Sequence, residues 1–253
     1  MGIGYNESVM PLDANIERIF ARLYALSQPL VKIKKQLQEL KSVLPKQVTL
    51  VAVSKTKPVQ DLIKAYDVGQ RIFGENKVQE MVEKYQQMPK DIEWHMIGHV
   101  QRNKVKYMAP FVDLIHGVDS LKLLSEINKQ ALKNNRCING LLQIKIAAED
   151  SKFGMTHEDI VTIINSTDFS ELKNIKVVGL MGMATFTDNE AQIKKEFEYL
   201  KSIFDILKSK ELFNFNLDIV SMGMSGDYEL AIACGSNMVR IGSNIFGARH
   251  YTN

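Results

Sequence analysis

The chain has 253 residues, of which 45% are apolar and 24% are charged, and its formal net charge is +3. This balance is typical of a globular protein in water, and so small a charge does not favour nucleic acid as a partner. No apolar run reaches the roughly 18 residues that a membrane-spanning helix needs.

The N-terminus and the cysteines indicate where the protein resides. The first residues lack the basic segment and apolar core of a signal peptide. Cys137 and Cys234 are far apart and outside any CxxC pattern, which is typical of reduced thiols. We therefore expect a cytoplasmic protein.

The first predicted element is a long helix from about Asp13 to Leu44. Apolar residues recur at helical spacing on both sides of Pro29, where a kink is expected. This helix occupies about residues 1–45 and precedes the main body of the fold, over about residues 46–253. No Pro-, Gly- or Ser-rich linker interrupts the chain, so residues 1–253 are expected to form one domain.

Strand-like and helical patterns then alternate. The eight strand-like runs are Val48–Ser54, Arg71–Gly74, Trp94–Gly98, Leu114–Val118, Leu141–Ala147, Val177–Ala184, Asp218–Met224 and Met238–Ile241. The helical patterns are Val59–Val68, Val78–Gln87, Asn103–Ala109, Ser120–Asn134, His157–Ile164, Asn189–Lys208 and Asp227–Ala233. Such alternation predicts parallel βαβ units, and eight of them close into an α/β fold of the (β/α)8 TIM-barrel type. A doubly wound open sheet is the alternative, although no GxGxxG motif follows a strand.

The first strand ends near a lysine. On period-two alternation Thr49, Val51, Val53 and Lys55 share one face. If that face points into the barrel, Lys55 stands at the C-terminal mouth, where barrel enzymes place reactive groups. A partly desolvated amine favours its neutral form, which is the nucleophile of Schiff-base chemistry. The simpler alternative is a lysine at the solvated end of an ordinary strand.

Two glycine- and serine-bearing loops follow strands seven and eight, where this fold commonly binds phosphate. Ser225, Gly226, Gly242 and Ser243 are the candidate phosphate contacts, because glycine lets the backbone approach an anion and helix N-termini offer free N–H groups. Arg240, within strand eight, needs an anionic or acceptor partner if it is buried. The alternative is that these residues only make tight turns and helix caps.

Other polar residues are expected at the same mouth. Asn76 ends strand two and is predicted either to bind a ligand or to cap the next helix. Met183, at the end of strand six, is predicted to fill the core or to pack on a flat ring. His95 and His99 share a strand face, but a strand does not converge an HxxxH pair on one ion and no third ligand is evident. No metal site is predicted.

A lysine on strand one and a phosphate cradle after strands seven and eight fit pyridoxal 5′-phosphate (PLP). At these residues the sequence resembles the YggS/PROSC family, the pyridoxal phosphate homeostasis proteins. The matching stretches are Val51–Pro58, Phe73–Asn76, Trp94–Gly98, Ser221–Ser225 and Val239–Arg249. The resemblance implies a barrel like the N-terminal domain of bacterial alanine racemase, with Lys55 as the internal-aldimine lysine. The expected cofactor-binding residues are Lys55, Asn76, Met183, Ser221, Ser225, Gly226, Arg240, Gly242 and Ser243.

The resemblance implies a protein that carries, buffers or delivers PLP without robust turnover. Alanine racemase appends a second domain that supplies its second base, and this sequence, which stops at Asn253, shows no such domain. A racemase of small amino acids, or a decarboxylase, with His99 or Tyr228 as the other base is the alternative. A barrel for another phosphorylated metabolite and an interaction protein are further possibilities. The expected partners are PLP and apo PLP-dependent enzymes, with no nucleic acid or membrane, and the chain is expected to be a monomer or weak dimer.

Overall fold

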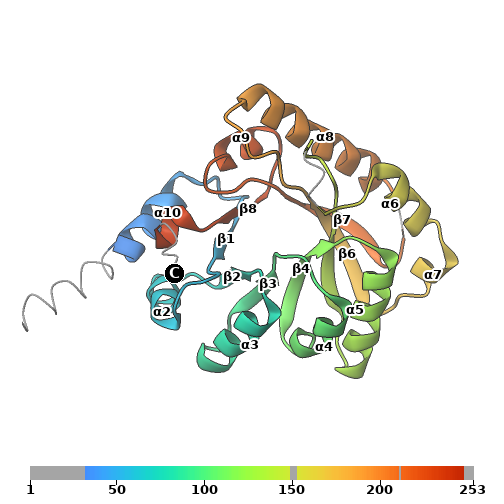
Figure 1. The fold of residues 1–253 in the computed structure, drawn as a ribbon, viewed down its shortest axis with the longest axis horizontal. Coiled ribbons are helices and arrows are strands. Elements are labelled where there is room, and N and C mark those ends of the chain that lie inside the picture. The colour runs from blue at the N-terminus through green and yellow to red at the C-terminus, as the bar shows by residue number, and fades with distance from the viewer. Residues whose placement is uncertain (1–31, 149–152, 211, 248–253) are drawn as a thin grey trace, which may run out of the picture.

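The computed structural model describes residues 32–148, 153–210 and 212–247. Eight parallel strands form a closed barrel in chain order, and β1 pairs with β8 to complete the ring (Figure 1). The strands are β1 (Thr49–Val53), β2 (Ile72–Glu75), β3 (Glu93–Met96), β4 (Val112–Val118), β5 (Ile138–Gln143), β6 (Ile175–Met181), β7 (Phe215–Ser221) and β8 (Met238–Ile241). The predicted (β/α)8 barrel is confirmed, and the open sheet is excluded because the ring has no edge.

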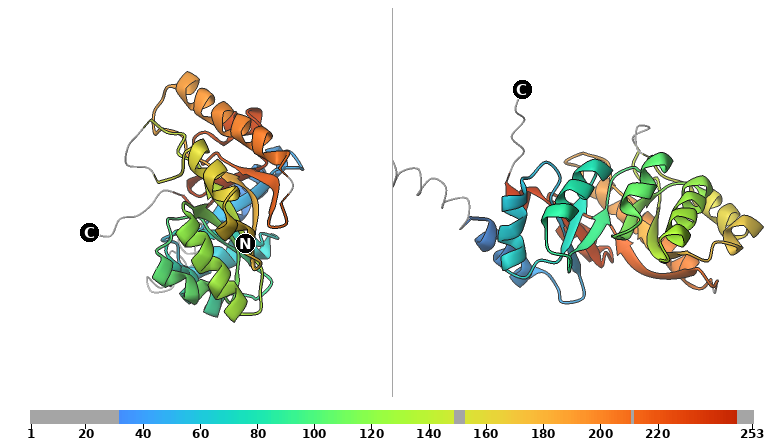
Figure 2. Two further views of the ribbon diagram at one scale, coloured as in Figure 1. Left: turned by 90° about the vertical axis from the view of Figure 1, so that its right-hand side faces the viewer. Right: turned by 90° about the horizontal axis from the view of Figure 1, so that it is seen from below.

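Helices lie outside the ring of strands. They are α2 (Val59–Asp67), α3 (Val78–Gln87), α4 (Val105–Met108), α5 (Leu121–Lys133), α6 (His157–Ile164), α7 (Thr167–Ser170), α8 (Glu190–Lys208), α9 (Tyr228–Ala233) and α10 (Ser243–Phe246). Figure 2 shows α8 and α5 on opposite sides of the barrel with the strands between them. None of the helices in the described part of the chain has the length and apolarity that crossing a bilayer requires.

The extra helix before the barrel is confirmed over residues 32–43, which are helical. Ile33, Leu37 and Leu40 bury one face of this helix in the core, and an ion pair of 3.4 Å joins its Lys34 to Asp67 at the end of α2. The helix therefore covers the flank of the barrel beside α2 (Figure 1). The earlier part of the predicted helix, with the kink expected at Pro29, lies outside the described residues.

Several predicted boundaries were wrong. Strands β5 and β7 each begin three residues earlier than their apolar runs predicted, at Ile138 and Phe215. The runs continue beyond the strands because Ile144, Ile146 and Met222 are buried in the loops at the mouth, where burial and not strand pairing selects apolar residues. The third predicted helix is instead a 3₁₀ turn (Arg102–Lys104) followed by the single turn of α4.

The barrel interior holds its own layer of apolar side chains. Val51, Leu114, Leu141, Met181 and Met238 form this cluster, apart from the larger core between strands and helices. Because side chains alternate along a strand, residues two positions further point into the same interior, one layer closer to the mouth. The sequence places polar residues at several of these positions.

Candidate functional site at the barrel mouth

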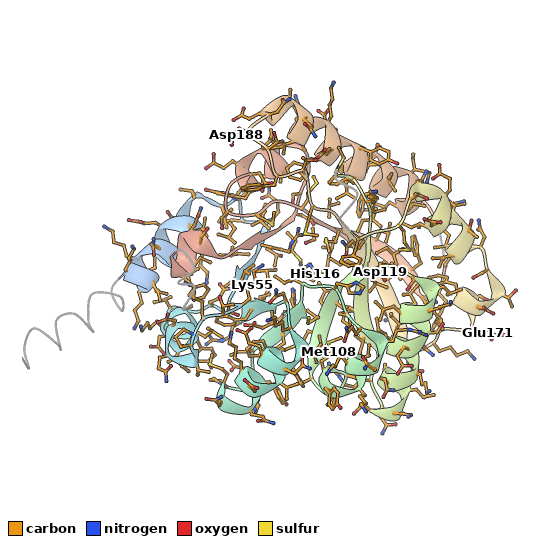
Figure 3. All side chains as sticks on the ribbon, viewed as in Figure 1. Lys55, Met108, His116, Asp119, Glu171 and Asp188 are labelled. Atoms are coloured by element: carbon orange, nitrogen blue, oxygen red, sulfur yellow. The ribbon has the colours of Figure 1, made fainter. Side chains whose placement is uncertain are left out.

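Lys55 lies at the C-terminal mouth, two residues beyond the end of β1. Val51 of the same strand belongs to the interior cluster, so this face of β1 does point into the barrel as predicted. The Lys55 side chain is half-buried, and Figure 3 places it, like His116, within the ring of strands, whereas Glu171 and Asp188 lie at the periphery. Lys55 is therefore not at a fully solvated strand end, and its role as a reactive group stays a prediction.

Lys57, which the sequence analysis did not single out, ties the β1 loop to the end of the barrel. Its Nζ donates to the carbonyl oxygens of Phe246 at 3.0 Å and Gly247 at 3.1 Å. Phe246 is the last residue of α10, the helix directly after β8 and Gly242, and Gly247 follows it. The contact therefore fixes the Lys55 loop against the predicted phosphate loop.

Arg240 of β8 is buried and points into the barrel, with 4% of its surface exposed. One guanidinium nitrogen donates to the carbonyl oxygen of Ser221 at 2.8 Å and to its Oγ at 2.7 Å. The other terminal nitrogen donates to the carbonyl oxygen of Gly182 at 3.0 Å. Burial lowers the pKa of Arg240 to about 10, against the opposing charge of Asp227, so the group stays cationic at neutral pH. The arginine thus finds acceptors at the ends of β6 and β7.

Ser221 connects Arg240 to two buried histidines, His116 of β4 and His95 of β3. The Ser221 Oγ lies 3.2 Å from His116 Nδ1, and His116 Nε2 lies 3.1 Å from His95 Nδ1. Because a guanidinium can only donate, we assign the Ser221 hydrogen to His116 Nδ1 and the His116 Nε2 hydrogen to His95. We call these four residues the interior chain.

Burial keeps both histidines of the interior chain neutral. It lowers the pKa of His95 to about 3. It lowers the pKa of His116 well below the ordinary value, and the nearby His95 and Arg240 act in the same direction. From the sequence, His95 was considered only as a metal ligand, and no metal site was predicted. His116 was missed, and its one signal is a polar residue within the apolar run of β4. His99, predicted on the same strand face as His95, instead lies beyond β3 and pairs with Asp119 at 3.0 Å.

The two predicted phosphate loops meet. The Ser225 Oγ accepts a hydrogen bond of 3.2 Å from the Gly242 N–H, and Asn244 Nδ2 donates to the Ser225 carbonyl oxygen at 3.1 Å. Gly226 and Ser243, the neighbours of these residues, are exposed. A Cβ added at Gly226 would meet no atom within 4 Å, so the loop leaves open space there. The four candidate phosphate contacts are therefore gathered at one edge of the mouth.

Asn76 and Met183 complete the predicted site. The Asn76 Oδ1 is buried without a hydrogen-bond partner among the described residues. An unpaired buried acceptor is costly, and a ligand that donates a hydrogen bond would relieve that cost. Met183 is half-buried and packs against the interior cluster below the mouth. An aromatic ligand with a hydroxyl group would suit both residues, because the hydroxyl could donate to Asn76 and the ring could pack on Met183. PLP is a ligand of this kind.

Metal ligation has no candidate in the described ranges, where no group of three or more His, Cys, Asp or Glu side chains converges.

The sequence is similar to known proteins that share this fold. The family described as alanine racemase, N-terminal domain, matches residues 29–250. The protein of Haemophilus influenzae named pyridoxal phosphate homeostasis protein is 41% identical over 208 residues, which cover 81% of this chain and 86% of the relative. The protein of the same name from Escherichia coli K12 is 37% identical over 212 residues, which cover 82% and 88%.

A solved structure of similar sequence shares the same barrel. That of PipY from Synechococcus elongatus PCC7942, with PLP bound, is 32% identical, covers 85% of this chain and 100% of that chain, and superposes with a TM-score of 0.77. The chain belongs to the family of pyridoxal phosphate homeostasis proteins, built on the barrel of the alanine racemase N-terminal domain.

Proposed function

We propose that this protein binds PLP through Lys55 and acts in PLP homeostasis by carrying, buffering or delivering the cofactor. The observation that carries the proposal is the half-buried Lys55 at a barrel mouth whose other edge gathers the four candidate phosphate contacts. The PLP-bound structure of a relative with 32% identity supports the choice of ligand. Two free cysteines are in keeping with the reducing cytoplasm.

PLP supplies an aldehyde that condenses reversibly with a lysine amine. Lys55 would hold the cofactor covalently through its amine nitrogen, with one water released on binding and taken up again on release. Ser225, Gly226, Gly242 and Ser243 would hold the phosphate with hydroxyl and backbone N–H groups.

Arg240 would face the ring rather than the phosphate, because Ser221 and the Gly182 carbonyl oxygen already hold its terminal nitrogens below the mouth. A cation in that place discourages protonation of the pyridine nitrogen. An unprotonated ring withdraws electrons poorly, which favours storage of the cofactor over turnover of amino acids.

The covalent bond tests the proposal directly. Purified protein mixed with PLP is expected to develop an absorbance band near the visible edge. Borohydride should then fix the cofactor on the peptide that contains Lys55, as mass spectrometry can show. Lys55→Ala should abolish the band, whereas Lys77→Ala, which removes an exposed lysine beside Asn76, should keep it. A colourless wild-type protein would exclude PLP binding.

Delivery requires a second experiment. We propose apo PLP-dependent enzymes as recipients, and loaded protein should reactivate one of them in the presence of a trap for free PLP. If the trap abolished reactivation, the cofactor would pass through solution, and the protein would act as a buffer and not as a direct donor. Inversion of an amino acid at about 1 s⁻¹ or faster, a rate typical of enzymes, would overturn the carrier in favour of a racemase.

A further inference from the structure

A buried cluster of charged side chains lies behind Lys55, on the side of β2 that faces α3. Glu75 of β2 is fully buried, and its Oε1 accepts from Lys84 Nζ of α3 at 2.7 Å. The same Lys84 Nζ contacts Glu80 Oε1, one helical turn earlier, at 2.7 Å. Lys84 itself is buried, with 6% of its side chain exposed. We call Glu75, Glu80 and Lys84 the outer clamp.

The outer clamp holds the backbone on both sides of Lys55. Before the lysine, the Ser54 carbonyl oxygen accepts from Lys84 Nζ at 2.8 Å, and the Ser54 Oγ donates to Glu75 Oε1 at 2.5 Å. After the lysine, the Thr56 N–H donates to Glu80 Oε1 at 2.6 Å. Each neighbour of Lys55 is thus bonded to a charged side chain of the clamp.

The backbone that the clamp holds is strained. Thr56 has φ of +63°, in the left-handed region that β-branched residues rarely adopt. Such a conformation is energetically unfavourable and persists only where surrounding contacts impose it. The bond from the Thr56 N–H to Glu80 is a contact of this kind, and the strained residue directly follows Lys55.

Stability alone is a weak reason for such a cluster. Desolvation offsets most of the attraction within a buried ion pair, and apolar side chains of similar size often serve as well. Moreover, the Glu75 Oε2 is buried without a partner among the described residues, which adds to the cost. What apolar residues could not supply is a donor to the Ser54 carbonyl and an acceptor for the Thr56 N–H.

We propose that Glu75, Glu80 and Lys84 are positioning residues, which fix the backbone at Ser54 and Thr56 and thereby aim the Lys55 amine into the mouth. The inference rests on the proposed function, since it concerns how readily Lys55 reaches a cofactor aldehyde. It predicts that loosening the clamp slows formation of the covalent bond and leaves the rest of the cofactor site intact.

Glu80 gives the sharpest test, because it is the most exposed member of the clamp and its loss leaves Glu75 and Lys84 paired. Glu80→Ala removes the acceptor of the Thr56 N–H, whereas Glu80→Gln keeps an oxygen there. Two ligands separate the effects: PLP, which has the aldehyde, and pyridoxine 5′-phosphate, which lacks it. Stopped-flow absorbance measures bond formation with PLP, and calorimetry measures the Kd of pyridoxine 5′-phosphate.

Glu80→Ala is expected to slow bond formation about tenfold or more, because small misplacements of a reacting group cost that much. The Kd for pyridoxine 5′-phosphate should stay within about twofold of the wild-type value, and Glu80→Gln should react nearly as fast as wild type. The Thr56 amide should lose hydrogen-exchange protection in Glu80→Ala. Adding Thr56→Gly should restore part of the rate, since glycine adopts positive φ without strain.

An unchanged rate of bond formation with PLP in Glu80→Ala would overturn the proposal that the outer clamp positions Lys55. Equal losses of PLP and pyridoxine 5′-phosphate binding, with a lowered melting temperature, would also overturn it in favour of a merely structural role. A wild-type protein that binds pyridoxine 5′-phosphate but never reacts with PLP would refute the proposed function instead. Exchange of the Thr56 amide would still test the clamp in that case, because it needs no cofactor.

Discussion

The interior chain and the outer clamp bury polar groups on opposite sides of the strands in different ways. In the interior chain one cation, Arg240, is held by uncharged acceptors, and burial keeps both histidines neutral, with the pKa of His95 lowered to about 3. In the outer clamp the carboxyl groups of Glu75 and Glu80 both contact Lys84. There burial raises the pKa of Glu75 to about 7, although Lys84 and Ser54 oppose the rise.

The difference gives the two clusters opposite responses to pH. A buried histidine with a lowered pKa stabilises the fold above its unfolded pKa of about 6.5, and this stability is lost as pH falls. A carboxyl with a raised pKa stabilises the fold below its unfolded pKa of about 4.5, and this stability is lost as pH rises toward 7. Low pH therefore lowers the contribution of the interior chain to the stability of the fold. A rise toward neutral pH lowers the contribution of the outer clamp.

Removing Arg240 should have the largest effect on the interior chain. Arg240→Leu removes the guanidinium donors of the Ser221 hydroxyl and the Gly182 carbonyl oxygen in a buried place, whereas the Ser221 carbonyl oxygen keeps the Gly182 N–H as a donor. We expect a loss of about 4 kcal/mol in the free energy of unfolding, because unpaired buried groups cost 1–3 kcal/mol each. Urea denaturation measures it, and Arg240→Lys, which keeps a charged donor, should lose less. A change below about 1 kcal/mol would mean that these bonds do not hold the mouth.

Acid sensitivity should be the next largest effect. His95→Asn keeps an acceptor near the position of Nδ1 but removes the titrating ring. Between pH 6 and pH 4 the free energy of unfolding of wild type should fall more steeply than that of the variant, by about 1.4 kcal/mol per pH unit. If the free energies of unfolding of the two proteins changed in parallel with pH, the pKa of His95 in the folded state would lie near its unfolded value of about 6.5.

The barrel and much of the mouth could be predicted from the sequence, because they depend on local patterns. Alternation along β1 placed Lys55, and glycine and serine spacing located the loops that meet at Ser225 and Gly242. Strand ends were less predictable, since Ile146 and Met222 are buried in loops for reasons of tertiary packing.

The two buried clusters could not be predicted in the same way. Lys84 stands among charged residues of a helix and has the pattern of a solvated face, and only contact with Glu75 of β2 explains its burial. His116 stands between apolar residues of β4 and Gly117, and its partners come from β3 and β7. Such clusters depend on contacts between elements that no local spacing records.

Glu75 should give a smaller effect of opposite sign to that of His95. Glu75→Gln keeps an oxygen for Ser54 and Lys84 but cannot ionise. From pH 5 to pH 7 the free energy of unfolding of wild type should fall relative to the variant, by about 2 kcal/mol in all. Thermal or urea unfolding across this range measures the difference. If wild type instead gained stability over the variant as pH rose, Glu75 would be ionised well below pH 7 and the contrast between the clusters would disappear.

Gly226→Ala should change stability least, because the phosphate loop depends on neither cluster. An added Cβ meets nothing within 4 Å, and we expect a change within about 0.5 kcal/mol in the free energy of unfolding. PLP affinity should nevertheless fall if the phosphate lies against this backbone, since the methyl group would occupy the space it needs. Gly242→Ala is the matched comparison, because its Cβ would lie 3.1 Å from the Val53 carbonyl oxygen and would press on β1. Loss of affinity without loss of stability in Gly226→Ala alone would place the phosphate at this loop, and unaltered affinity would move it elsewhere along the mouth.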